Sequence, residues 1–505
     1  MMTKNHTLFF FAMLVICGKV AGFGKDLLLS YYHGASQLTD SFFIANSLAS
    51  LFYASLYLSV PTIIIPYYSR IIVELNNLDY KTELYSLCQS FVIISAILTI
   101  IVFNSADFLV QLSFPELSYN TKKAATGFLK IISLTFCFST VVALCNSIQV
   151  VNGTKFLSFV VPVVNNFAFI VSLLIFTNTN EFKNILWAGF ISWLSLSIVN
   201  VLHSKELVSF KLTTSFPLLT KKSILITFLP ALIGFYIEQV NNYISIFFAS
   251  NLGEGGVSII SYANKINLIL VSIFMIFLNV YIFPKLASSR FQTEVSGIAS
   301  LSTMIFKWIL IISIPLTFIL FIYSNPIVSV LFERGQFTYA NTLSVASVLS
   351  IFSLSLPALL LRDLLNRIVF SFENTTITMF SLLISVTLHG VLSFHFSREY
   401  GLNGIAIAAV LSSVVNIILL LIFLRVYFGI QLISTTFKDI FICFFALSLA
   451  CTLSSIIFRI VDLGWFLDSV FISISYLIAL HFLGLKEITS ILAKLSLIVK
   501  NYSIR

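Results

Sequence analysis

The chain is poor in charge. Of its 505 residues only 10% are Asp, Glu, Lys or Arg, whereas 58% are hydrophobic. A soluble globular chain carries about 25% charged residues, so the low charge content excludes that class. A membrane β-barrel is excluded as well, because its strands alternate apolar and polar residues whereas the apolar runs here are continuous. Each of these runs is about twenty residues long, which is long enough for a helix to cross a bilayer.

The sequence also lacks the motifs of common enzyme classes. It contains no Walker A, HExxH or GxSxG motif, and its six histidines show no metal-ligand spacing. None of the six cysteines forms a CxxC pair, and all lie in apolar runs, which favours buried small side chains over disulfides or metal ligands. We therefore expect a transporter rather than an enzyme, with no cofactor, and leave a coupling ion open.

The apolar runs predict an all-α polytopic membrane protein with about fourteen transmembrane helices. The candidate spans are 7–29, 40–67, 84–112, 124–151, 156–177, 184–203, 223–250, 256–284, 301–323, 340–371, 376–397, 403–427, 438–460 and 465–485. The first run superficially resembles a signal peptide. Because Lys19 follows it and the pattern continues into further spans, we interpret it as an uncleaved span.

Basic residues gather on one side of these spans. They are concentrated in residues 205–222, 285–290, 425–438 and 486–505, which an even number of spans places together. Because Lys and Arg are enriched in cytoplasmic loops, the pattern predicts that both termini are cytoplasmic, here in a bacterial inner membrane. The same bias explains the net charge of +9, so no nucleic-acid partner is expected.

Weak internal similarity relates the two halves of the chain. A shift of 218 residues superposes Ala45-Asn46 on Ala263-Asn264. Transporters built from such repeats bind substrate at the interface between the halves. We expect two six-helix lobes in a V-shaped arrangement plus two C-terminal helices. The boundaries are 1–204 for the N-lobe, 205–222 for a cytoplasmic linker, 223–430 for the C-lobe, and 431–505 for spans 13 and 14 with a basic tail.

Ionisable side chains inside the first span are candidate site residues, because hydrocarbon rejects a charge that faces neither water nor a partner. Lys19 and Lys25 are six residues apart, about 120° around an ideal helix. Gly18, Gly22 and Gly24 surround them, and glycine weakens a helix, so a bend could turn both ammonium groups into one cavity. The alternative is that Lys25 snorkels to the outer interface.

Further candidates lie in spans 2, 7 and 8. Lys265 and Asn264 belong to a polar run in span 8, which favours a cavity-lining role. Glu238 in span 7 is expected in an inward-facing polar patch, paired with a lysine, or else as a protonated structural residue. Asp40 opens span 2, where a site role and stabilisation of the helix N-terminus are both open. Arg362, with its neighbours Asp363 and Arg367, is interpreted as a cytoplasmic anchor.

Together these residues predict one site. We expect Lys19, Lys25, Asp40 and Lys265 to line a water-filled cavity between the lobes. Several buried lysines indicate an anionic cargo, because lysine binds phosphate as a point charge.

Five segments carry a resemblance to a known family. They are Gly34-Ala35 through Leu38-Thr39-Asp40-Ser41-Phe42-Phe43, Leu229-Pro230-Ala231-Leu232 through Gln239-Val240-Asn241, Leu331-Phe332-Glu333-Arg334-Gly335-Gln336-Phe337-Thr338, Leu356-Pro357-Ala358 through Asn366-Arg367, and Gly401-Leu402-Asn403-Gly404-Ile405-Ala406. These segments resemble the MviN/MurJ family of lipid II flippases, which shares a superfamily with multidrug antiporters. The LFERGxFT pattern is the most specific, and the order and spacing of the segments together with the fourteen-span plan extend the resemblance over nearly the whole chain.

The resemblance implies a function. It is the turning of a polyprenyl-pyrophosphate-linked glycan precursor, lipid II or a similar lipid-linked oligosaccharide, from the inner to the outer leaflet by alternating access. The implied partners are this substrate and membrane lipids, for a monomeric protein. In the family, cationic residues of spans 1, 2 and 8 line the cavity, and spans 13 and 14 help form a groove for the lipid tail. Asp40 matches the family's aspartate of span 2.

The sequence departs from the family pattern at its cationic positions. Lys19 and Lys25 stand where span 1 of the family has arginines, and Lys265 replaces the arginine of span 8. Tyr53 stands at the family's span 2 arginine. Charge persists at three positions, but the bidentate fork that suits pyrophosphate does not. An O-antigen or capsule repeat-unit flippase is therefore an alternative, as are a cation-coupled drug antiporter and a non-transporting scaffold.

The predicted topology can be tested with reporter fusions. Fusions after Gly34 and after Asn251 should report the outer side of the membrane, because both positions follow an odd-numbered span. Fusions within residues 205–222 should report the cytoplasm and serve as the control. A cytoplasmic signal at either of the first two positions would overturn the span assignment.

Overall fold

The computed structural model describes residues 2–74, 79–154, 156–204, 222–277, 295–372, 376–458 and 464–484, and within these ranges it contains helices and no strands. The helices are α1 (Met2–His33), α2 (Gln37–Glu74), α3 (Asp79–Ser113), α4 (Tyr119–Ser133), α5 (Thr135–Val151), α6 (Phe156–Ile175), the 3₁₀ helix η1 (Thr179–Glu181), α7 (Phe182–Ser204), α9 (Lys222–Ser250), α10 (Gly256–Phe277), α13 (Val295–Ile322), α14 (Ser324–Phe332), α15 (Tyr339–Ser353), α16 (Leu356–Ser371), α17 (Thr376–Phe428), α18 (Ile433–Phe458) and α19 (Gly464–Phe482). The all-α class is confirmed.

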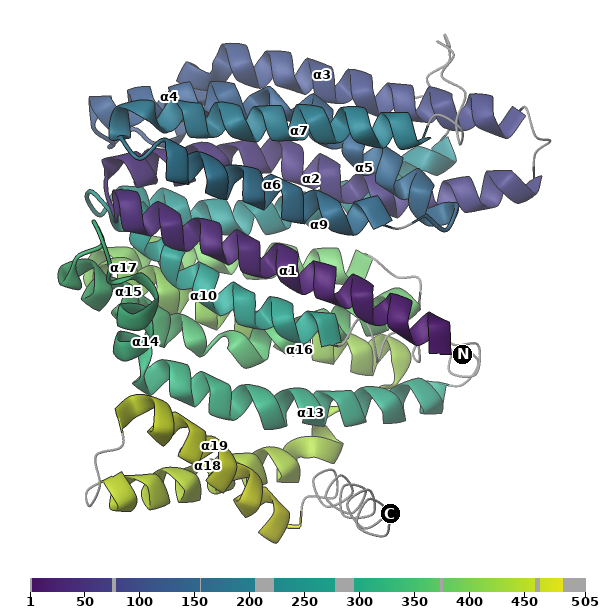
Figure 1. Cartoon of the computed structure of the whole chain (residues 1–505). Helices are drawn as coiled ribbons and strands as arrows, with labels where there is room; N and C mark the ends of the chain where they lie inside the picture. Colours follow the sequence, from purple (N-terminus) through teal and green to yellow (C-terminus); the bar gives the residue numbers. More distant parts are fainter. Residues whose placement is uncertain are drawn as a thin grey trace.

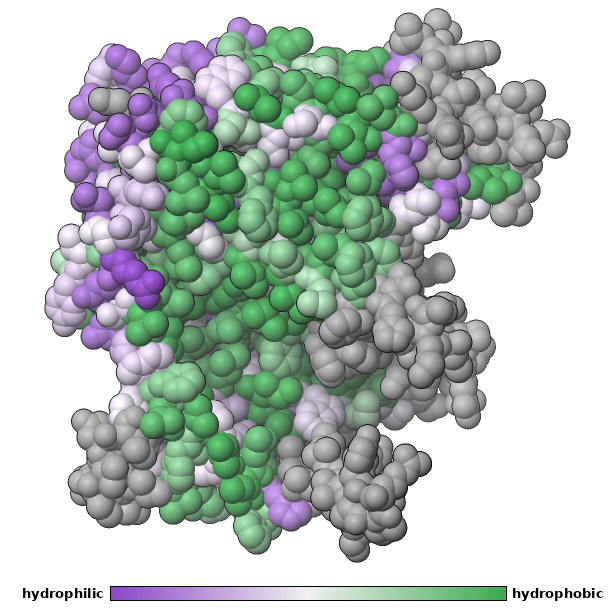
Figure 2. All heavy atoms as spheres, in the orientation of Figure 1, coloured by the Kyte–Doolittle hydropathy of each residue, from purple (hydrophilic) through white to green (hydrophobic). Residues whose placement is uncertain are grey.

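Many of these helices are suited to a membrane. Within the described ranges, nine helical stretches are long and apolar enough to cross one, with α4 and α5 counted together as Tyr119–Val151, or ten if the pair α15 and α16 forms one bent span. A broad apolar band covers the visible face of the molecule, and hydrophilic side chains gather at its left end, over the ends of α4 and α15 (Figure 2). The multi-pass membrane class follows, while the count of fourteen spans stays a prediction.

Some helices are divided differently from the predicted spans. The span predicted at 124–151 is two helices, α4 and α5, which meet at Leu134. The span predicted at 340–371 is bent by 45° between α15 and α16. Helix α17 breaks at Gly401, whose φ of 58° and ψ of −134° are not helical, and this break lies between the predicted spans 376–397 and 403–427. The sequence signals for the α4–α5 and α15–α16 breaks are a single Ser-Leu-Thr and a single Ser-Leu-Ser step, too weak to separate from a continuous apolar run.

Hydroxyl side chains are accommodated inside the apolar helices by bonds to their own backbone. Ser59 donates to Leu56 O at 2.9 Å, and Ser90 donates to Ser86 O at 2.9 Å. Because hydrocarbon offers no partner to a polar group, a hydroxyl that bonds one turn back removes the cost of its own burial. Buried serines and threonines of this kind therefore indicate helix packing and not a binding site.

Among the described residues, the largest buried cluster joins the two halves of the chain at one end. We call this the Gly34 end; it holds the loops 34–36, 114–118, 251–255 and 333–338. A cluster near it combines Phe42 and Phe128 of the first half with Tyr262 and Phe332 of the second. Farther from it, buried residues of α2, α3 and α5 form one cluster and those of α13 and α16–α19 form another. The halves are thus joined by packing at the Gly34 end and have separate cores beyond it.

Helices α18 and α19 form a hairpin that packs beside α13 (Figure 1). Lys307 of α13 makes an ion pair of 2.7 Å with Asp439 of α18. Just after the end of α13, Tyr323 donates a hydrogen bond to Asp468 of α19, which also accepts from Ser454 of α18. Polar contacts at the middle and at the C-terminal end of α13 therefore fix the hairpin to the second half.

The lobe boundaries stay predictions. Residues 205–221 of the expected linker, the basic segment 285–290 and the tail 485–505 lie outside the described residues. Figure 1 shows α2–α7 on one side of α1, and α10 with α13–α16 on the other. Helix α9 packs closely against both α2 and α17, so it connects the two groups.

The break in α17 generates a test of the fold. A Cβ atom at Gly404 would lie 2.0 Å from the backbone oxygen of Phe396, closer than any real contact. We expect Gly404→Ala to destabilise the protein by several kcal/mol, because backbone must move to admit the methyl group. Gly390→Ala, on the same helix, is the control, since its Cβ would meet only Ile244 Cδ1 at 3.7 Å. Thermal unfolding in detergent measures both; equal melting temperatures would show that the turn is not tight.

Candidate functional site

Helix α1 is held against α6 by its glycines. A Cβ at Gly18 would lie 3.5 Å from Pro162 Cβ, and one at Gly22 would lie 3.2 Å from Asn166 Nδ2. Asn166 Nδ2 also donates to Gly18 O at 3.1 Å. The predicted bend in α1 is wrong, because the helix runs unbroken from Met2 to His33. The glycines instead let two helices approach closely, and this fixes the direction of the lysines on α1.

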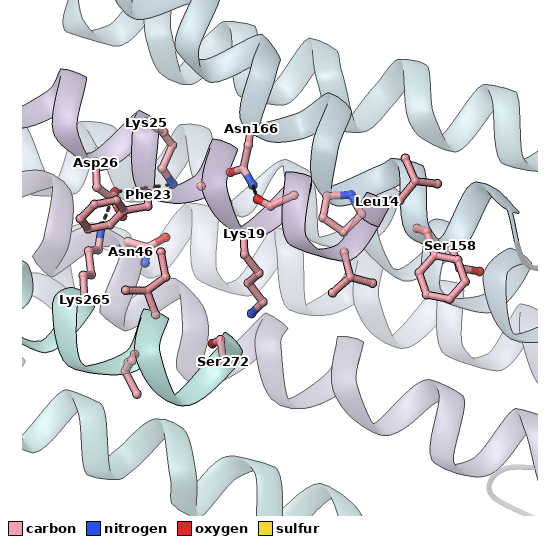
Figure 3. Close-up of a pocket in the computed structure, with 17 residues that line it drawn as sticks. Leu14, Lys19, Phe23, Lys25, Asp26, Asn46, Ser158, Asn166, Lys265 and Ser272 are labelled. Carbon is pink, nitrogen blue, oxygen red and sulfur yellow. Dashed lines mark hydrogen bonds and ion pairs between the residues drawn. The ribbon is translucent and has the colours of Figure 1, made fainter. Parts of the chain in front are cut away.

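A cavity of about 580 Å³ lies between α1 and α6 of the first half and α10 of the second. Lys19, Lys25 and Lys265 all line it, as do Asp26 and Asn46. Figure 3 shows Lys25, Asp26, Lys265 and Asn46 close together, with Lys19 directed away from them toward Ser272. Helices α1 and α10 therefore bring into one cavity the three lysines that the sequence placed on spans 1 and 8.

Asp26 links the lysines of the two halves. Its carboxylate makes an ion pair with Lys265 of α10 and lies 3.9 Å from Nζ of Lys25 (Figure 3). The Asp26 side chain is 10% exposed, and the two lysine side chains are 22% and 27% exposed. In such a partly buried setting a charge is stable only with a partner. Asp26 therefore neutralises one of the two positive charges when no anion is bound.

Two aromatic rings support the same ammonium groups. Lys265 Nζ lies 4.6 Å from the ring centroid of Phe43, and Lys25 Nζ lies 5.1 Å from that of Phe169. A cation over a ring face is stabilised by about 0.5–2 kcal/mol. The lysines are thus held in place by groups that do not consume their hydrogen-bonding capacity, which stays available to a ligand.

Lys19 differs from the other two lysines. It is exposed to the cavity, and the described residues offer its ammonium group no acid or hydrogen-bond acceptor. Figure 3 shows it two turns of α1 from Lys25 and directed toward Ser272 of α10. Three lysines and one aspartate give the cavity a formal charge of +2. The surplus positive charge favours an anionic ligand.

The cavity changes character along its length. The charged residues Lys25, Asp26 and Lys265 lie toward the Gly34 end, whereas Leu14 and Phe159 lie toward the N-terminal end of α1. A ligand with a charged head and an apolar tail matches this distribution, because each part finds its preferred surroundings.

Asp40 lies outside the cavity, contrary to expectation. Its side chain is 3% exposed and caps the start of α10: Oδ2 accepts from Gly255 N at 2.6 Å, and Oδ1 accepts from Ser258 N at 2.8 Å and from Ser258 Oγ at 2.6 Å. The first backbone N–H groups of a helix have no partner within it and attract negative charge. Because all its acceptor capacity faces α10, Asp40 joins the halves instead of facing a ligand.

Backbone groups complete the contact around Asp40. Gln336 N donates to Tyr31 O at 2.8 Å, and Tyr262 Oη donates to Gly34 O at 3.2 Å. A Cβ at Gly34 would lie 2.6 Å from Gln336 O, and one at Gly335 would lie 2.3 Å from Tyr31 O. Both glycines have positive φ, of 59° and 61°. We call these contacts, together with those of Asp40, the Gly34 closure. Its glycines explain the Gly34 and LFERGxFT segments, which place backbone against backbone.

The remaining expected residues lie elsewhere. Glu238 pairs with an arginine and not with a lysine: its Oε1 lies 3.4 Å from Nη2 of Arg362, which is also 3.4 Å from Asp363. Arg362 thus links α16 to α9 and is more than a cytoplasmic anchor. Asn264 is half-buried on α10 and, like Glu238, is absent from the cavity lining. One residue on an ideal helix turns the side chain by about 100°, which separates Asn264 from Lys265.

Tyr53, at the position of the family's missing arginine, is packed within the first half. Its ring stacks on Phe136 of α5, with centroids 5.4 Å apart and planes 15° apart. It does not line the cavity. The substitution therefore replaces a charge by a packing contact and provides no substitute for the charge.

Sequence reasoning missed two cavity residues. Asp26 directly follows Lys25 in the predicted span 1, and this position is the sequence signal that could have found it. Asn46 was overlooked although the repeat superposes it on Asn264. Of that pair the structure directs Asn46 and not Asn264 into the cavity.

These features define a class of protein: a helical membrane transporter with a cationic cavity between two halves that are closed at one end. The family model described as lipid II flippase MurJ matches residues 29–475. The chain belongs to this family. Membership of a flippase family confirms a transporter and not an enzyme.

Relatives and solved structures agree. The probable lipid II flippase MurJ of Aquifex aeolicus (strain VF5) is 27% identical over 424 residues, 80% of each chain. That of Buchnera aphidicola subsp. Schizaphis graminum (strain Sg) is 27% identical over 518 residues, 94% of this chain and 96% of the relative. A lipid II flippase MurJ in an inward closed conformation superposes with a TM-score of 0.78 and 22% identity, covering 93% of this chain and 98% of that one.

The fold extends to other transporters. An inward-facing multidrug resistance MATE family transporter of the MOP superfamily superposes with a TM-score of 0.64 and 15% identity, covering 83% of this chain and 94% of that one. At this identity the likeness shows the fold alone. Among the described residues no group of three His, Cys, Asp or Glu side chains could hold a metal ion.

The Gly34 closure generates a test. We expect Asp40→Asn to weaken it, because the amide loses the charge and one of the acceptor oxygens that bind α10, where charge-assisted bonds contribute about 1.5–3 kcal/mol. Spin labels at the exposed Asn178 and Glu399, one on each half, measure the separation by pulsed electron resonance. Asp40→Asn should add a population at longer distance.

The matched control is Asp107→Asn. Asp107 is 64% exposed and pairs with Lys130 at 3.4 Å on the surface of the first half. This change should leave the distance distribution unchanged. A distribution for Asp40→Asn that equals the parent's would show that Asp40 does not hold the closure.

Proposed function

We propose that this protein is a flippase for a polyprenyl-diphosphate-linked glycan precursor, lipid II or a close analogue, which it moves from the inner to the outer leaflet. The observation that carries the proposal is the cavity between α1, α6 and α10 with its three lysines. Family membership supports the substrate class, and the cavity supplies the matching chemistry: positive charge for the diphosphate and an apolar wall for the start of the lipid chain.

The lysines bind the diphosphate by exchanging partners. In the empty cavity Lys265 is paired with Asp26. A diphosphate brings several anionic oxygens, so it competes with the single carboxylate for Lys25 and Lys265, and Lys19 adds a contact with no partner to displace. Because the Asp26–Lys265 pair bridges α1 and α10, this exchange also replaces a bond between the two halves by a ligand held between them.

The transport step requires the Gly34 closure to open. We place the Gly34 end at the outer face of a bacterial inner membrane, with both termini in the cytoplasm, in line with the distribution of basic residues. The described conformation is then closed to the outside. Opening separates Asp40 from α10 and the backbone pairs around Gly34 and Gly335, and each is a polar contact that water can replace at the membrane surface.

The protein works as a monomer in this proposal, with membrane lipids around it and no cofactor. One chain supplies all three lysines of the cavity, from α1 and α10. A coupling ion is compatible with the scheme and would act on the equilibrium between the closed and the open state of the Gly34 closure.

A second glycan is favoured by one specific observation. Lysine at all three cationic positions, with Tyr53 packed against Phe136, leaves the cavity without an arginine fork among its lining residues. A point charge selects phosphate less strictly than a bidentate fork does. An O-antigen or capsule repeat unit on the same diphosphate carrier is therefore the alternative substrate.

Lys265 provides the test of this function. We expect Lys265→Met to lower transport of a labelled polyprenyl-diphosphate sugar in proteoliposomes roughly ten- to a hundredfold, the equivalent of about 1.5–3 kcal/mol for a charge-assisted contact. Lys265→Arg should retain most of the transport, because the charge is kept. The same variants should follow this order in complementing a flippase-depleted strain, once the parent is shown to complement.

Lys130→Met is the control, because Lys130 pairs with Asp107 at the surface. It should transport like the parent. Full transport by Lys265→Met at parental protein levels would contradict a binding role for Lys265. A parent that moves neither lipid II nor an O-antigen precursor would contradict the proposed function itself.

A further inference from the structure

Asn46 is the residue of α2 that lines the cavity. Every other residue from Asp40 to Ala49 is buried, whereas Asn46 is exposed and lines the cavity. The other side chains of this stretch pack or bond within the protein, as Asp40 does with α10. A single exposed polar residue on a fully packed helix face is not required by the fold.

The Asn46 amide has no structural task. No described residue lies within hydrogen-bond distance of it, in contrast to the other amides near the cavity. Asn166 donates to Gly18 O at 3.1 Å, and Asn267 donates to Phe352 O at 3.2 Å and to Ser355 Oγ at 3.0 Å. Those two amides fasten helices together. Asn46 keeps two donors and an acceptor free inside the membrane, where a polar group without a partner is costly.

Asn46 lies close to the charged residues of the cavity. Figure 3 shows its amide beside Asp26 and Lys265. Phe43, three residues earlier and one turn away on α2, supports the Lys265 ammonium at 4.6 Å. A diphosphate bound by Lys265 therefore presents its next group to Asn46. An amide is neutral, so it adds little to the binding of an anion, but it both donates to and accepts from hydroxyl and acetamido groups.

We infer that Asn46 determines specificity for the sugar joined directly to the diphosphate. The lysines bind the phosphates, which all substrates of this carrier class share. Asn46 binds the hydroxyl or acetamido substituents of the first sugar, which differ among them. This inference rests on the proposed function and assigns its glycan selectivity to α2.

Two probes separate the sugar from the diphosphate. One is a polyprenyl diphosphate without sugar, and the other is the same lipid bearing a single N-acetylhexosamine. The measured quantity is the ratio of their affinities for the purified full-length protein in detergent. Asn46→Leu keeps the size of the side chain and removes its polar atoms, so the preference for the sugar-bearing probe should fall roughly two- to tenfold, as for the loss of one or two neutral hydrogen bonds.

Two other variants locate the effect. Lys265→Met should weaken both probes together and preserve their ratio, because both carry the diphosphate. Asn104→Leu, which removes an exposed amide of α3 that bonds only Ile100 O at 2.8 Å, should change neither affinity. Asn46→Gln should recover part of the preference, since it restores the amide on a longer stem.

The outcomes decide between the ideas. An unchanged ratio in Asn46→Leu, whether both affinities fall or neither does, overturns the assignment of sugar specificity to Asn46. A parent that binds the sugarless and the sugar-bearing probe equally well overturns it too, but leaves the diphosphate site intact. A parent that binds neither probe contradicts the proposed function, which is a different result.

Discussion

The structure depends on the contact that joins the two halves of the chain at the Gly34 end. At that end the carboxylate of Asp40 binds the N-terminus of α10, and the backbone at Gly34 lies directly against that of Gln336. Such an approach needs glycine on both sides, since a methyl group at Gly34 or Gly335 would overlap a carbonyl oxygen. The contacts of the Gly34 closure are polar, and they lie next to the apolar cluster that includes Phe42, Tyr262 and Phe332. Water can replace these polar contacts, as a transporter that alternates between two states requires.

The charges in the cavity are balanced only in part. Three lysines in a partly buried site repel one another, and Asp26 relieves part of that repulsion without filling the cavity. The rings of Phe43 and Phe169 hold the ammonium groups in place and leave their donors free. The site is consequently stable when empty and still carries surplus positive charge. An anion that replaces Asp26 as the partner of Lys265 affects both halves, because the Asp26–Lys265 ion pair joins α1 of one half to α10 of the other.

Acidic residues illustrate how one residue type acquires different roles in this fold. Asp26 lies near the end of predicted span 1, and Asp40 lies at the start of span 2. Their surroundings separate them: Asp26 faces two lysines, whereas Asp40 faces backbone N–H groups. Glu238 meets an arginine of α16. The partner, and not the charge itself, decides whether each acid modulates binding or joins helices.

The sequence by itself determined the class of fold and the chemistry of the site. Continuous apolar runs can only be satisfied as helices in a membrane, and lysines within them must face water, an anion or an acid, so Lys19, Lys25 and Lys265 could be predicted. Only the tertiary structure decided that Asp40 turns to α10, that Asn46 enters the cavity and that α1 runs straight. These outcomes depend on which side of a helix meets a neighbour. Neighbouring residues on a helix point about 100° apart, so one can face the cavity while the next faces the core. The packing of distant helices decides which of the two faces the cavity.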